Sequence, residues 1–254
     1  MESNMFLDSE NYILEGKEMI YFKHSNNLVY NINDAIKDFG AKAIFSSPKK
    51  DIKVIRESIA EYFFISALKK DTGKDWFIMQ PQNDPPDFWL MTFDKNLITL
   101  DPFELVEIPE HFSKFDEMFG VVNKKINKRY SERYNLLIFV NNKSSNNWVE
   151  LLHKNLGEYF PFKTVWTIKL LSGKDNQNIS KFVINRIRPF PIKNIITSFD
   201  DEIIFRYADI PDFMEEKIFN GKTFLSLKKD FVKDLTKEMR RWILDNKIRL
   251  RNEK

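Results

Sequence analysis

The sequence of 254 residues contains no cysteine, and this absence excludes several classes of protein. Without thiols there is no disulfide scaffold, no cysteine nucleophile and no cysteine-ligated zinc or iron–sulfur centre. Only seven glycines are present, and none of them forms a Gly-x-x-x-x-Gly-Lys, Gly-x-Gly-x-x-Gly or Gly-x-Ser-x-Gly motif. A nucleotide-binding loop or a hydrolase nucleophile elbow is therefore not expected.

Long hydrophobic runs are also missing. No stretch of about 18 uncharged apolar residues occurs, and Met1 to Glu10 holds no basic segment followed by an apolar one. We therefore expect no membrane span and no export signal, with the cytoplasm as the default location. The three histidines, at positions 24, 111 and 153, have no partner at helical spacing, so a histidine-rich metal site is not expected either.

What is present fits a soluble globular protein, with 43% apolar and 15% aromatic residues. The 40 basic and 37 acidic residues nearly cancel, but Leu225–Lys254 holds ten basic and five acidic residues, a local charge of +5. Apolar residues recur there at helical spacing, which predicts a C-terminal helix with a basic outer face. Such a face can attract phosphate, although a solvated surface is the simpler interpretation.

The order of predicted elements indicates a mixed α/β fold. Helical periodicity runs from Lys50 to Lys70 and ends at Thr72-Gly73. Aromatic and β-branched runs separated by turn residues predict three successive strands at 76–79, 87–93 and 97–108. A helix at about 113–133, a buried strand at 134–140, a helix at 147–159 and a strand at 164–171 follow.

The flanking segments are predicted to pack on this core. Short runs at 19–23 and 28–32 are read as strands, and a short helix is expected over 33–40. The predicted organisation is an N-terminal extension (1–49), a core (50–170), and C-terminal β elements with the basic helix (171–254), all within a single domain.

Two carboxylates occupy positions where a hairpin brings them together. Asp87 follows Pro86 at the head of one strand, and Glu104 lies in the tail of the next strand. Adjacent carboxylates repel unless a cation lies between them, and oxygen ligands favour Mg²⁺ or Mn²⁺. The pattern predicts a divalent-cation site at Asp87 and Glu104.

These residues resemble the PD-(D/E)XK, or restriction-endonuclease-like, nuclease superfamily. Pro86-Asp87 matches the first half of its motif, and Glu104-Leu105-Val106 matches the second half. The resemblance covers roughly residues 50–170. It implies a restriction-endonuclease-like core, Asp87 and Glu104 as metal ligands with the Leu105 carbonyl as a third, and a helical glutamate, Glu61 or Glu57, that holds water.

One position departs from the motif, because Val106 stands where the superfamily usually has lysine. Some members carry this lysine on a neighbouring helix, and the natural donors in this chain are Lys124, Lys125 and Lys128. Glu107 faces the other side of the strand and cannot replace the lysine. A different register with Glu107 as the metal ligand stays open, because Pro102 can introduce a bulge.

The resemblance implies a metal-dependent endonuclease that hydrolyses DNA phosphodiester bonds in bacterial restriction, phage defence or DNA repair. It also implies a homodimer or a defence-system partner protein. Two alternatives stay open. One is a catalytically silent nuclease-like fold that binds nucleic acid or protein, which Val106 favours; the other is a protein–protein adaptor, which the acidic bulk of the chain favours.

Overall fold

The computed structural model describes residues 10–13, 19–23, 25–81, 86–94, 97–128, 133–141, 148–157, 160–172, 181–189, 191–198, 214–219, 222–228 and 230–231. The elements are β1 (Glu10–Ile13), β2 (Met19–Lys23), α1 (Ser25–Phe39), α2 (Ala41–Ser46), α3 (Lys50–Thr72), β3 (Trp76–Pro81), β4 (Phe88–Asp94), β5 (Leu97–Ile108), α4 (Phe115–Ile126), β6 (Asn135–Val140), α5 (Trp148–Asn155), β7 (Thr164–Ser172), β8 (Lys181–Arg188), β9 (Lys193–Ser198), β10 (Met214–Phe219) and β11 (Lys222–Leu227). Within these ranges no helix has the length and apolar character that a bilayer crossing requires.

The fold is mixed α/β, as predicted, and is organised around a sheet of nine strands in chain order, β1 to β9. The pairs β5–β6 and β6–β7 are parallel, and every other neighbouring pair in this sheet is antiparallel. The predicted order of helices and strands from residue 50 to 170 is confirmed. Strand β6 is buried along its whole length, as its continuous apolar run predicted.

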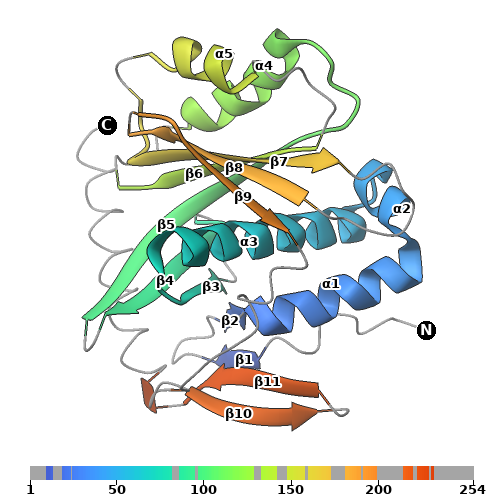
Figure 1. Cartoon of the computed structure of the whole chain (residues 1–254), viewed down its shortest axis with the longest axis vertical. Helices are drawn as coiled ribbons and strands as arrows, with labels where there is room; N and C mark the ends of the chain where they lie inside the picture. Colours follow the sequence, from blue (N-terminus) through green and yellow to red (C-terminus); the bar gives the residue numbers. More distant parts are fainter. Residues whose placement is uncertain are drawn as a thin grey trace.

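One face of the sheet packs against α3, which lies between strands β7 to β9 and α1 (Figure 1). The helix buries Tyr62, Phe63 and Phe64, each with no exposed surface. Phe63 stacks on Phe182 of β8 at 3.8 Å between ring centroids. The large aromatic area buried in this way stabilises the contact between α3 and the sheet.

The opposite face packs against α4 and α5 (Figure 1). Met118 and Val122 of α4 and Leu152 of α5 are buried against Ile138 of β6. Alternate residues of β5 divide between the two faces: Leu105 belongs to the α3 side, and Val106 to the α4 side. This alternation decides where each polar side chain of β5 points.

Three segments differ from the predictions. Residues 28–32, predicted as a strand, belong to α1, because Leu28, Ile32 and Ala35 follow helical spacing and are all buried. Leu225–Leu227, predicted to begin the basic helix, ends β11 instead, and residues 232–254 lie outside the described ranges. Helix α4 is also shorter than predicted and ends at Ile126, with Asn127 as its C-cap.

A candidate carboxylate–lysine site

The register of β4 and β5 brings Asp87 and Glu104 to the same place. Phe88 pairs with Phe103, and their rings stack at 5.1 Å between centroids on the α3 side. Because side chains alternate along a strand, the residues just before Phe88 and just after Phe103 face the α4 side. Asp87 and Glu104 are these two residues, so the sheet presents both carboxylates to α4.

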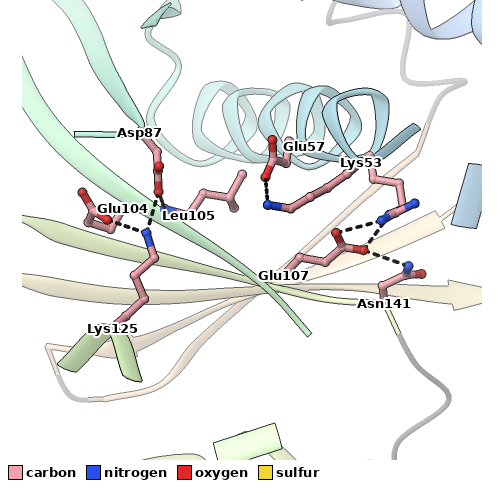
Figure 2. Close-up of polar contacts among 9 residues, drawn as sticks. Lys53, Glu57, Asp87, Glu104, Leu105, Glu107, Lys125 and Asn141 are labelled. Carbon is pink, nitrogen blue, oxygen red and sulfur yellow. Dashed lines mark hydrogen bonds and ion pairs between the residues drawn. The ribbon is translucent and has the colours of Figure 1, made fainter. Parts of the chain in front are cut away.

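Lys125, in the last turn of α4, joins the two carboxylates. Its Nζ lies 2.6 Å from Oε2 of Glu104 and 3.0 Å from Oδ2 of Asp87 (Figure 2). The exposed fraction of the side chain is 16% for Lys125, 30% for Asp87 and zero for Glu104. The carboxylate–lysine site, as we name these three residues, is therefore open to solvent on the Asp87 side and closed around Glu104.

The backbone of β5 helps to fix Asp87. Its Oδ2 accepts a hydrogen bond of 2.6 Å from the backbone N–H of Leu105 (Figure 2). The same oxygen also accepts from the Lys125 ammonium. Charge-assisted bonds of this kind are short and strong, so Asp87 is held at a defined position although it precedes the first residue of β4.

The protonation of Lys125 follows from its surroundings. Burial is the largest single influence and lowers the pKa of the ammonium, but the charges and hydrogen bonds of Asp87 and Glu104 together outweigh it. The net result is a pKa above the ordinary lysine value. Lys125 is therefore a cation at neutral pH, suited to stabilising negative charge and not to accepting a proton.

The remaining predicted site residues lie elsewhere. Lys124 and Lys128 have exposed side chains, so of the three candidate lysines the structure brings Lys125 to the carboxylates. Glu61 is buried on α3, which covers the other face of the sheet, and Glu57 pairs with Lys53 at 3.1 Å on the same helix. The backbone of Leu105 meets the site through its N–H, whereas the prediction concerned its carbonyl.

The alternative register with Glu107 as the metal ligand is wrong. Strand β5 pairs with β4 in continuous register from Phe88–Phe103 to Asp94–Leu97, with Pro102 opposite Trp89, so there is no bulge. Glu107 points to the α3 side and pairs with the Arg56 guanidinium, with Oε1–Nε and Oε2–Nη2 distances of 2.6 and 3.1 Å. A carboxylate engaged in this way is part of the core.

The sequence reasoning missed the network around Glu107. Arg56 also donates to the carbonyls of Ile44 and Ser47, and Asn141 donates to Glu107 and to the carbonyl of Phe45. The network ties α2 and the residue after it to the ends of β5 and β6. An available signal was the position of Arg56 directly after Ile55, inside the apolar stripe of α3.

The donor set of the carboxylate–lysine site fits a divalent cation bound by few protein ligands. Among the described residues there is no group of three or more acidic or histidine side chains that could enclose a metal ion. Asp87 and Glu104 each bring an oxygen within 3.0 Å of one cationic atom, the Lys125 nitrogen. Mg²⁺ is commonly held by one or two carboxylates, with water and substrate phosphate as its other ligands.

Comparisons of this chain with protein-family models, with curated proteins and with solved structures found no match.

Proposed function

We propose that this protein is a metal-dependent nuclease of the PD-(D/E)XK type that hydrolyses phosphodiester bonds in DNA. The observation that carries the proposal is the convergence of Asp87 directly before β4, Glu104 of β5 and Lys125 of α4. These are the three residue types of the motif, and Lys125 supplies from α4 the cation that Val106 cannot supply from β5. The proposal includes a restriction-endonuclease-like core formed by α3 to β7.

Each residue then has a definite task. Asp87 and Glu104 would hold the cation through their carboxylate oxygens. When bound, Mg²⁺ or Mn²⁺ would polarise a phosphate oxygen and lower the pKa of water, which favours hydrolysis. Lys125, protonated because of its two carboxylate neighbours, would stabilise the negative charge that develops on the phosphate.

The surroundings of the site support these tasks. Glu104 is completely buried, so its charge acts in an environment with little solvent screening. Asp87 is the more exposed of the two carboxylates and is oriented by the backbone of β5. A substrate phosphate can therefore approach from the Asp87 side while Glu104 stays fixed by the core.

A cleavage assay on the full-length chain tests the proposal. Supercoiled plasmid and single-stranded DNA are incubated with Mn²⁺ or Mg²⁺ and with Asp87→Asn, Glu104→Gln or Lys125→Met variants. We expect the wild type to cut, and each variant to lose about 10²-fold or more of the rate, because each removes a charge at the reacting group. EDTA should abolish cleavage by the wild type.

Two control variants separate this loss from a general change of charge. Asp101→Asn removes a β5 carboxylate that pairs with Lys163 near the surface, and Lys154→Met removes an exposed lysine of α5. Both should cut at nearly the wild-type rate, since exposed charges contribute little. Cleavage by the three site variants at the wild-type rate would overturn the proposal.

A second function is favoured by a specific observation. Lys125 already neutralises part of the charge of the carboxylate pair without a metal ion. A nuclease-like fold that only binds nucleic acid would keep such a cluster for stability. DNA binding by the wild type that weakens with salt, without turnover in either metal, would select this alternative.

A further inference from the structure

The Lys125 ammonium lies at the point where the two carboxylates converge (Figure 2). We propose that Lys125 occupies the place of the divalent cation in the metal-free protein and thereby weakens metal binding until its ammonium is displaced. The proposal rests on the proposed function and concerns the regulation of the same site. Lys125 would thus act as an internal competitor of the metal as well as a residue for the reaction.

One oxygen of Asp87 and one oxygen of Glu104 lie 3.0 and 2.6 Å from the same nitrogen. A metal ion held by these two oxygens would stand within a few ångströms of that nitrogen, and like charges at such a separation repel strongly where solvent is limited. Metal and ammonium therefore cannot both keep these contacts.

The Lys125 ammonium can move away from the two carboxylates. The residue belongs to the last turn of α4, and Met118 and Val122 anchor the same helix in the core. A lysine ammonium sits on a flexible four-carbon chain, so it can move while the helix stays in place. The open Asp87 side is the direction from which a phosphate would offer the ammonium another anionic partner.

A metal ion that binds here must displace the Lys125 ammonium from the carboxylates. In the metal-free state, removal of Lys125 would take the counter-charge of its ammonium away from two neighbouring carboxylates, one of them fully buried. In the wild type Lys125 supplies that charge. A cation that enters must therefore replace an existing ion pair, and a variant without the ammonium should bind the metal more tightly.

Calorimetric titration of the full-length protein with Mn²⁺ tests the inference. We compare the wild type with Lys125→Met, with Lys125→Gln, which keeps a hydrogen-bond donor without the charge, and with the Lys154→Met control. The Kd for Mn²⁺ should fall at least about tenfold in both Lys125 variants and stay unchanged in Lys154→Met. Adding Asp87→Asn to Lys125→Met should remove this gain.

Thermal unfolding with and without Mn²⁺ gives a second measurement. Lys125→Met should unfold at a lower temperature than the wild type without metal and should gain more from Mn²⁺, because a ligand that binds only the folded state stabilises it. If Lys125→Met does not fold even with Mn²⁺, Lys125→Gln decides the matter. A Kd no lower than that of the wild type in the folded variants, or no Mn²⁺ binding by any of them, would overturn the inference.

The two proposals fail in different ways. If the Lys125 variants bind Mn²⁺ more tightly but the wild type never cuts DNA, the competitor role stands and the nuclease proposal falls. If the wild type binds Mn²⁺ and cuts DNA while the variants gain no affinity, the reverse holds.

Discussion

Removal of the Glu107 carboxylate should destabilise the protein strongly, because it leaves the Arg56 guanidinium buried without its counter-charge. The side chains of Arg56 and Glu107 are each only 7% exposed, and two short contacts join them. In Glu107→Ala, Arg56 keeps its bonds to the carbonyls of Ile44 and Ser47 but has lost its charge partner. Asn141 also loses one of its two acceptors.

The magnitude follows from the burial of the pair. Breaking a buried ion pair by removing one partner costs about 3–5 kcal/mol, whereas replacing both partners by apolar residues is often nearly neutral. For a chain of this size each kcal/mol lowers the melting temperature by about 2–4 °C, so Glu107→Ala should melt about 6–20 °C below the wild type. The double variant Arg56→Met with Glu107→Leu should lose about 2 kcal/mol or less, mainly for the carbonyls that Arg56 no longer bonds.

Urea unfolding followed by far-UV circular dichroism measures both free energies of unfolding. A loss below about 1 kcal/mol in Glu107→Ala, or a double variant less stable than the single one, would refute the reasoning. The same variant also tests the place of Glu107 in the molecule. Folded Glu107→Ala protein should bind Mn²⁺ as the wild type does, and loss of binding would return Glu107 to the ligand set.

Three further predictions concern Lys125, the end of α3 and the interior of α4. The pKa of Lys125 is raised in the folded protein, so its contribution to stability is complete below the ordinary lysine pKa of about 10.4 and is lost as pH rises through the folded value. The difference in unfolding free energy between wild type and Lys125→Met should therefore be constant from pH 7 to about 10 and should shrink at higher pH. An increase of this difference above about pH 10 would contradict the raised pKa. Gly73 ends α3 with φ of 69°, so Gly73→Ala should cost about 1 kcal/mol of unfolding free energy through backbone strain alone, since an added Cβ meets no atom within 4 Å. Gly120 lies inside α4, where an added Cβ also meets no atom within 4 Å, so Gly120→Ala should raise the free energy of unfolding by about 0.5–1 kcal/mol through its higher helix propensity. Urea unfolding measures both variants, and equal effects of Gly73→Ala and Gly120→Ala would contradict this account.

Much of the fold follows from periodicity that is visible in the sequence. The apolar stripe of α3 and the continuous apolar run of β6 predicted a helix and a buried strand, and the strands predicted on either side of residues 94–96 pair in antiparallel fashion. Residues 28–32 were misassigned because a short β-branched and aromatic run was weighed above the helical spacing of Leu28, Ile32 and Ala35. Tertiary burial, which the sequence does not display, decided between the two.

The hairpin of β10 and β11 was missed although the sequence carries its strongest short signal. Phe219 pairs with Lys222, and the two residues between them are Asn220 and Gly221. Asn-Gly between two strands is the preferred sequence of a two-residue hairpin turn. The weight given to basic residues in the C-terminal region obscured this signal.

The candidate site could be predicted in part. Hairpin geometry was enough to place Asp87 beside Glu104, because pairing register and alternation are local properties. The choice of Lys125 from three candidate lysines depended on the rotation of α4 about its axis, which the packing of Met118 and Val122 sets. The Arg56–Glu107–Asn141 contacts join residues 51 and 34 positions apart, and no sequence pattern predicts such pairings.

The strands of the nine-stranded sheet lie in the same order in space as along the chain, and this affects how the protein can fold during synthesis. Each strand, once synthesised, finds its partner already in place and needs no later segment to be inserted between them. Where the connection is short, as between β3 and β4 or β4 and β5, loop closure costs little entropy, which lowers the barrier to pairing. A nascent chain can therefore extend its sheet one strand at a time as it leaves the ribosome, and β9 can complete the packing on α3 only at the end.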